Sequence, residues 1–182
     1  FVLNPDTELI KGSINTLIDF TLLHKSVIVG PRLLNPDGSV QDSCYNEPTF
    51  FGAIKEYFFN IHGAFEKYAP HGEQPVKVDA VVGAAMLIPR KVIERVGKFD
   101  ERFFMYFEDL EFCSRVRENG LSIYYLPISQ IIHEHGGVTR TVSKQANEWL
   151  INSSKIYHGT IKYYLLTFIL WIGQKWQKVN SL

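Results

Sequence analysis

Side chains that could do chemistry occur at three separate places along this chain. Asp6 follows a short apolar run, Glu108 and Asp109 stand together at an expected helix start, and His133 and His135 follow an apolar segment. Carboxylate oxygens and imidazole nitrogens bind divalent cations, and a carboxylate can also take a proton from a reacting hydroxyl. Because ligands gather outside the carboxyl ends of strands in open α/β sheets, we expect the three places to converge.

Each of these places also has an explanation that involves no catalysis. Asp6 could cap a helix that begins near Thr7. Two acidic residues in the first turn of a helix are favoured by the helix dipole alone. The two histidines could lie at the surface beside Gly136 and Gly137. None of the three places therefore decides the function by itself.

The elements that must position these residues alternate between strands and helices. Apolar runs predict strands at 1–3, 26–30, 121–126 and 128–133, and a strand pair or bulged strand at 76–89. Helical spacing predicts helices at 7–23 and 90–96, and from Asp109 to a terminating Gly120. This alternation indicates an α/β fold with a mixed sheet flanked by helices.

Composition limits the class of protein and of partner. The chain has 182 residues, of which 46% are apolar and 21% charged, so one globular domain is expected. Lys plus Arg and Asp plus Glu number 19 each, so no overall positive field points to nucleic acid. Two cysteines, Cys44 and Cys113, make neither a disulfide framework nor a zinc site, and we expect both to be reduced.

Four blocks of residues, in this order, resemble family 2 glycosyltransferases of the GT-A fold. Within that family, these blocks most resemble the rhamnosyltransferase-like enzymes of bacterial polysaccharide and O-antigen synthesis. The blocks are Asn4-Pro5-Asp6-Thr7, residues 78–86, residues 97–115, and His133 followed by Gly136-Gly137. The resemblance covers about residues 1–164 and implies a partial GT-A fold.

The resemblance also implies a metal site. Members of this family carry an Asp-x-Asp element that holds a divalent cation on the donor diphosphate, and this chain has Asn4-Pro5-Asp6 at that place. Asp6 is then the expected ligand for Mn²⁺ or Mg²⁺, while Asn4 would contact sugar, ribose or water. His133 would be the second ligand, with His135 as the alternative, and an imidazole ligand favours Mn²⁺ over Mg²⁺.

The same resemblance makes Asp109 the catalytic base. Inversion at the anomeric carbon needs a carboxylate that accepts the proton of the attacking hydroxyl. Glu108 would hydrogen-bond the acceptor or shape the site, and the two roles could exchange if the helix begins one residue later. Gly83 and Ala84 would leave room for the donor sugar and the acceptor at the backbone.

These roles predict an inverting hexosyltransferase of the cytoplasm that works in bacterial cell-surface polysaccharide synthesis. Its donor would be a nucleotide-diphosphate sugar, with deoxythymidine-diphosphate rhamnose suggested by the resemblance, and its acceptor a glycan or a lipid-linked glycan. Family members begin with a nucleotide-binding half that has no counterpart here. We therefore expect a fragment of a longer protein, with low activity and weak donor binding by itself.

The end of the chain, 159–182, is expected to form an aromatic-rich amphipathic helix after a catalytic part at 1–158. Residues 163–173 carry no charge but are too few for a membrane span, which needs about 20 residues. Lys162 and Lys175 flank this run, and tyrosines and tryptophans crowd its ends, which is typical of a helix at a membrane surface. Packing on the domain or on a second copy in a homodimer is the other interpretation.

Two other functions are compatible with parts of this pattern. The chain could be a non-catalytic module that docks to a membrane or partner through its last helix. It could also be a metal-dependent phosphohydrolase that uses Asp6 and His133. The second is the weaker hypothesis because two-metal sites usually need more carboxylates.

Overall fold

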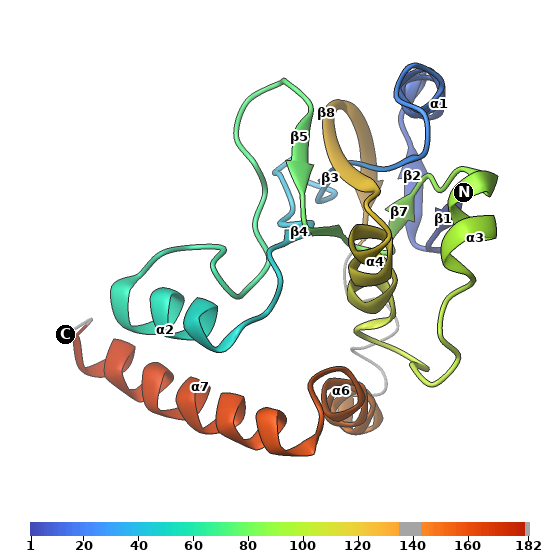
Figure 1. Ribbon diagram of the computed structural model, residues 1–182. Coiled ribbons are helices and arrows are strands. Elements are labelled where there is room, and N and C mark those ends of the chain that lie inside the picture. Colours follow the sequence, from blue (N-terminus) through green and yellow to red (C-terminus); the bar gives the residue numbers. More distant parts are fainter. Residues whose placement is uncertain (135–142, 181–182) are drawn as a thin grey trace.

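The computed structural model describes residues 1–134 and 143–180, which form a mixed sheet with helices on both faces (Figure 1). Strand β8 (Ser122–His133) is central, with β3 (Val27–Leu34) parallel to it along one edge. Along its other edge lie two antiparallel strands, β5 (Val76–Val78) and β2 (Thr7–Leu9). The prediction of an α/β fold with a mixed sheet is confirmed.

Strand β3 shows how the sheet is covered on both faces. Val27 and Val29 point to one face and pack against Leu17 of α1 (Ser13–Leu23). Ile28 points to the other face and belongs to the cluster that contains the buried residues of α4 (Glu108–Glu118). This alternation follows from the two-residue period of a strand. It fixes α4, and with it the acidic pair, on one side of the sheet.

The sequence predicted two extended pieces where the structure has the single strand β8. Its pairing with β3 shifts between the pair Pro31–Leu126 and the pair Arg32–Gln130. Pro127 lies within this shift and has no N–H to donate to a neighbouring strand. The irregularity thus explains the apparent break in the sequence pattern without ending the strand.

The prediction of one helix over 7–23 is wrong in its first part. Thr7 pairs with His133 in strand β2, and α1 begins only at Ser13. Gly12 precedes the helix with a φ of 90°, in the left-handed region, so no helix continues through it. Asp6 therefore precedes a strand, and the interpretation of Asp6 as a helix cap is also wrong.

Short strands and further helices complete the described chain. Strand β1 pairs with β7, and β4 pairs with β6. The helix predicted at 90–96 is confirmed as α3. The bounds are Val2–Leu3 for β1, Cys44–Tyr45 for β4, Ala80–Val81 for β6, Ala85–Met86 for β7, Phe50–Phe59 for α2, Arg90–Val96 for α3, Ser143–His158 for α6 and Thr160–Asn180 for α7.

Helices α2 and α7 lie side by side, away from the sheet (Figure 1). A side chain at Gly173 would place its Cβ only 2.5 Å from that of Tyr57, so the two helices pack closely at this point. Leu166 of α7 is also buried. Gly159, with a φ of 76°, separates α7 from α6.

Candidate active site

The acidic pair lies at the start of α4, after a strained piece of backbone. Tyr106 and Phe107 both have positive φ values, 67° and 66°, which side chains other than glycine seldom adopt. Such strain costs on the order of 1–3 kcal/mol per residue and collects at functional sites. Here the turn sets the start of α4 at Glu108, so the helix begins where the sequence predicted, within one residue.

Asp109 is a buried carboxylate held by backbone N–H groups. The N–H of Gly83 donates to its Oδ2 at 3.0 Å, and the N–H of Leu110 donates to its Oδ1 at 2.8 Å. The residue is only 8% exposed, and burial raises the pKa of its carboxyl group. A fixed carboxylate of raised pKa is suited to accept a proton.

Glu108 is less tightly held than its neighbour. Burial, and then the charge of Asp109, raise the pKa of Glu108 to about 7. Among the described residues, nothing donates a hydrogen bond to its buried Oε2. Glu108 thus exchanges a proton near neutral pH.

Gly83 lies directly against the acidic pair. A Cβ added to Gly83 would lie 3.6 Å from the Cβ of Asp109 and 4.0 Å from Oε1 of Glu108. The side chain of Ala84 instead packs into a buried apolar cluster with Leu33. The methyl group of Ala84 is therefore turned away from the acidic pair's surroundings into the core, and its backbone oxygen accepts from the N–H of Asn4.

Asp6 and His133 form a second pair at the end of strand β8. Oδ1 of Asp6 lies 3.4 Å from Nε2 of His133, and the backbone oxygen of Asp6 accepts from the N–H of Glu134. On the other side of the ring, Nδ1 lies 2.9 Å from Oε1 of Gln41. The amide nitrogen of Gln41 donates to the backbone oxygen of His133 and to Asn35, which fixes the orientation of this amide.

This arrangement fits a divalent cation. Because Oε1 of Gln41 can only accept, Nδ1 of His133 must carry the proton, and in a neutral ring Nε2 then presents its lone pair towards the Asp6 carboxylate. Burial lowers the pKa of His133, which favours the neutral ligating ring. A cation between the two groups would satisfy both.

The pair provides only part of a coordination shell. Over residues 1–134 and 143–180 the structure brings no group of three His, Cys, Asp or Glu side chains together as a metal site. A cation at this pair would need further ligands, such as phosphate oxygens or water, and the described residues supply too few carboxylates for a two-metal phosphohydrolase. His135, the alternative ligand, lies outside the described residues.

Backbone contacts connect the Asp6–His133 pair to the acidic pair. The N–H of Asn4, two residues before Asp6, donates to the oxygen of Ala84 at 2.9 Å, and the next residue back is Gly83, which binds Asp109. The exposed side chain of Asn4 lies along this connection. The structure therefore brings together the sequence-predicted residues of the described chain at one end of the sheet.

Lys67 and Tyr45 were not found from the sequence. Cys44 pairs with Tyr68, so the antiparallel register sets Lys67 opposite Tyr45. Burial, and then the charges of Asp109 and Glu108, raise the pKa of Tyr45.

Lys67 acts on both halves of the site. Burial raises the pKa of Asp109 and lowers the pKa of His133. The positive charge of Lys67 acts to lower both pKa values. Lys67 and Tyr45 lie in residues 44–74, which are rich in aromatics but show no helical or strand period. Gln41 belongs to no motif. None of these three residues could therefore be identified from the sequence.

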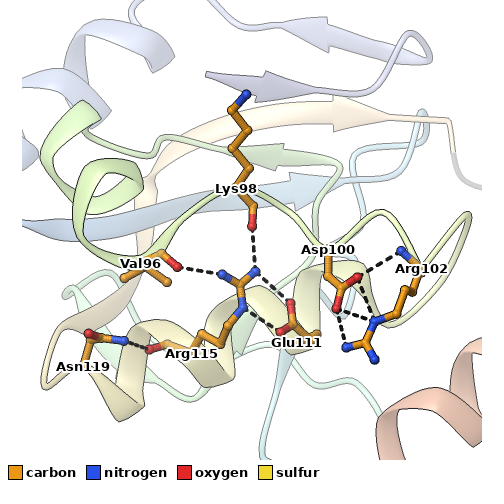
Figure 2. Close-up of polar contacts among 7 residues, drawn as sticks. All are labelled: Val96, Lys98, Asp100, Arg102, Glu111, Arg115 and Asn119. Carbon is orange, nitrogen blue, oxygen red and sulfur yellow. Dashed lines mark hydrogen bonds and ion pairs between the residues drawn. The ribbon is translucent and has the colours of Figure 1, made fainter.

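Arg115 braces the loop that leads to the acidic pair (Figure 2). Its guanidinium group donates to the backbone oxygens of Val96 and Lys98, each at 2.8 Å. The same group makes two hydrogen bonds to the carboxylate of Glu111, at 2.6 and 2.9 Å. One side chain thus ties the end of α3 to α4.

We expect Arg115→Lys to lower the free energy of unfolding by about 1–3 kcal/mol, because one ammonium group cannot reproduce this fork of bonds. Urea denaturation followed by circular dichroism measures the change. Arg90→Lys is the matched control, since Arg90 is exposed and makes only an i,i+4 ion pair with Glu94. Its effect should stay within about 0.5 kcal/mol. Equal effects of both variants would contradict the bracing role.

Comparison with known proteins shows that most of these residues lie in a segment shared with a protein family. The sequence profile described as "Glycosyl transferase family group 2" matches residues 38–180, which include Gly83, Glu108, Asp109 and His133.

Two curated relatives match nearly three quarters of the chain, and a third matches less than half. A low-salt glycan biosynthesis hexosyltransferase of Haloferax volcanii is 34% identical over 134 residues, which is 72% of this chain and 41% of that protein. An N-acetylglucosaminyl-diphospho-decaprenol L-rhamnosyltransferase of Mycobacterium tuberculosis is 31% identical over 145 residues, 72% of this chain and 45% of that protein. A rhamnosyltransferase of Escherichia coli is 32% identical over 80 residues, 44% of this chain and 30% of that protein. The chain thus spans less than half the length of these relatives.

Proposed function

Because this chain belongs to glycosyl transferase family group 2, we propose that it carries the catalytic centre of an inverting glycosyltransferase. The enzyme moves a sugar from a nucleoside-diphosphate donor to a hydroxyl group of a glycan or lipid-linked acceptor. The observation that carries the proposal is the buried Asp109, held by Gly83 and connected through Ala84 and Asn4 to the Asp6–His133 pair.

Asp109 is the base of this reaction. The acceptor hydroxyl attacks the anomeric carbon from the side opposite the diphosphate, a new carbon–oxygen bond forms, and the sugar–phosphate bond breaks. Asp109 takes the hydroxyl proton as the new bond forms, and its raised pKa strengthens it as a base. Glu108, the neighbouring carboxylate, hydrogen-bonds the acceptor or shapes the site around it.

Asp6 and His133 would hold the divalent cation that family 2 glycosyltransferases generally use. When bound, a divalent cation neutralises the charge that collects on the departing diphosphate. Gln41 keeps the ring of His133 in the orientation that ligation needs. The imidazole nitrogen favours Mn²⁺ over Mg²⁺.

The names of relatives support rhamnose as the transferred sugar. One relative, from Shigella flexneri, is a dTDP-rhamnosyl transferase that is 28% identical over 108 residues. The mycobacterial relative is named for a diphosphate-linked lipid acceptor. By this analogy we assign deoxythymidine-diphosphate rhamnose as donor and a lipid-linked sugar as acceptor, at the inner face of the membrane in cell-surface polysaccharide synthesis.

The full-length enzyme tests this assignment. It is incubated with MnCl₂, deoxythymidine-diphosphate rhamnose and N-acetylglucosaminyl diphosphate carrying a short prenyl chain. We expect release of deoxythymidine diphosphate and a mass increase of the acceptor by one rhamnose unit. A full-length protein that transfers no sugar from any of a panel of nucleotide sugars would support the docking module instead.

The exposed side of helix α7 is suited to contact with a membrane surface. One side packs on α2, and the other side exposes Ile161, Tyr164, Leu165, Phe168 and Trp171. Residues 160–180 contain three lysines and no acidic residue, so the charge of this helix complements anionic lipid headgroups. None of the helices in the described ranges has the length and apolar content needed to cross a bilayer.

We expect Phe168→Glu with Trp171→Glu to abolish binding to vesicles of phosphatidylglycerol and phosphatidylcholine, because the two charges replace the apolar contact. Flotation on a density gradient measures binding of the full-length protein. Leu22→Glu, an exposed position on α1, is the matched control and should leave binding unchanged. If the double variant instead converts a dimer to a monomer and leaves flotation unchanged, the exposed side of α7 is a homodimer contact.

A further inference from the structure

Lys67 is a cation of the candidate active site to which the proposed reaction gives no role. Its side chain is half-buried, and over residues 1–134 and 143–180 its ammonium group makes no hydrogen bond and no ion pair. Its charge nevertheless acts on Asp109 and on His133, which belong to the two halves of the site. An ammonium group in this position is available to an anionic ligand.

The backbone places the Lys67 side chain on the same face as the acidic pair. Cys44 and Tyr68 exchange two hydrogen bonds of 2.9 Å, in which each N–H donates to the oxygen of the other residue. Residues that lie opposite each other in antiparallel segments carry their side chains on one face, about 5 Å apart. Lys67 therefore lies beside Tyr45, whose hydroxyl group is within the field of Asp109 and Glu108.

The segment beside Lys67 also reaches the Asp6–His133 pair. Gln41, which orients the ring of His133, is two residues before Ser43. The oxygen of Ser43 accepts from the N–H of Val82, the residue before Gly83. Residues 41–45 thus run from one half of the site to the other, and Lys67 lies alongside them.

A buried carboxylate on α2 fixes the loop that leads to Lys67. The side chain of Glu56, which is 7% exposed, accepts from the N–H groups of Gly63 at 3.1 Å, Phe65 at 2.6 Å and Glu66 at 2.8 Å. Three hydrogen bonds to one carboxylate hold the backbone next to Lys67 in place. A backbone that is already ordered lowers the entropy cost of binding a ligand through this side chain.

The charges of the proposed reaction require a cation at this place. When the sugar–phosphate bond breaks, its electron pair stays on the diphosphate, which gains a negative charge. A divalent cation at Asp6 neutralises this charge only in part, because the carboxylate of Asp6 cancels some of the charge of the cation. Asp109 adds a further negative charge to the site. A fixed ammonium group therefore stabilises the departing diphosphate.

We propose that the ammonium group of Lys67 binds the diphosphate of the nucleotide sugar, together with the cation at Asp6 and His133. It donates hydrogen bonds to phosphate oxygens, keeps its proton throughout, and stabilises the charge that collects as the sugar leaves. The proposal rests on the proposed function and adds to it a protein cation as a direct contact of the donor.

Calorimetry on the full-length protein with MnCl₂ tests this contact without turnover. One probe is deoxythymidine diphosphate, and the other is inorganic pyrophosphate, which has the diphosphate but not the nucleoside that was assigned by analogy. We expect Lys67→Gln to weaken both probes about tenfold, because a charge-assisted hydrogen bond is lost. Lys67→Arg, which keeps the charge, should retain most of the affinity for both.

The matched control is Lys77→Gln, which removes an exposed lysine on β5 and should change neither dissociation constant. Unchanged affinity of Lys67→Gln for both probes overturns the proposal and leaves Lys67 acting on Asp109 alone. Failure of the parent protein to bind either probe overturns it as well. Neither result decides the proposed function, which fails only if the wild-type enzyme transfers no sugar from any donor of the panel.

Discussion

Asp109→Asn should lower kcat of the full-length enzyme by about 100-fold or more, with the donor KM little changed. A carboxamide has nearly the shape of a carboxylate but cannot accept the hydroxyl proton, and general base catalysis contributes about 10²–10⁴-fold. Release of the nucleoside diphosphate in the presence of saturating acceptor measures the loss. The same variant separates the two main interpretations of this chain, since a docking module would keep its function.

Glu108→Gln is the neighbouring control. It removes a carboxylate whose Oε2 has no hydrogen-bond donor among the described residues, but leaves Asp109 and its bonds from Gly83 and Leu110 in place. We expect a smaller fall in kcat and a larger rise in the acceptor KM. If Glu108→Gln abolishes turnover while Asp109→Asn retains most of it, then Glu108 is the base and the two roles are exchanged.

Folding must be shown to survive the Asp109 substitution. The asparagine side chain has one acceptor oxygen, so it can keep only one of the two backbone hydrogen bonds with its original geometry. Urea denaturation of the variant reports this cost separately from turnover. A fall in activity that follows only the unfolded fraction at assay temperature would argue against a catalytic role.

Asp6→Asn should have the second largest effect. Its carboxylate is the charged ligand of the proposed cation, and a divalent cation on a leaving diphosphate contributes several kcal/mol, so we expect at least about a 100-fold loss in kcat/KM. Titration with Mn²⁺ in the presence of deoxythymidine diphosphate, followed by electron paramagnetic resonance, should show weakened metal binding. Restored activity at high Mn²⁺ concentration would strengthen the assignment.

The control for this variant is Asp19→Asn, which changes an exposed carboxylate on α1. It should alter neither Mn²⁺ affinity nor activity. His133→Gln should also weaken Mn²⁺ binding, because it removes the imidazole nitrogen that lies 3.4 Å from Asp6. Unchanged Mn²⁺ affinity in both Asp6→Asn and His133→Gln would place the cation elsewhere.

Local patterns in the sequence determined much of the secondary structure. The helix at 90–96 and the one after Asp109 end at glycines, as Gly97 and Gly120 indicated, because helices often terminate where glycine frees the backbone. The adjacent residues Glu108 and Asp109, together with the segment Asn4-Pro5-Asp6, identified the candidate site. These features depend on residues close in sequence, so periodicity and motif spacing reveal them.

Other features depend on partners far along the chain. Thr7 continues a helical pattern in the sequence, yet it becomes a strand because β8, more than a hundred residues later, offers hydrogen bonds at His133. The pairing of β8 with β3, which continues on both sides of the register shift, likewise joins the two apparent pieces into one strand.

The remaining parts of the site were decided only by tertiary structure. Gln41 orients His133, and Lys67 lies opposite Tyr45, although no spacing in the sequence connects these residues to the acidic pair. Burial, which raises the pKa of Asp109 and brings that of Glu108 to about 7, exists only after the sheet and helices have packed. Sequence determined which groups could react, and the fold decided which of them meet and in what state of charge.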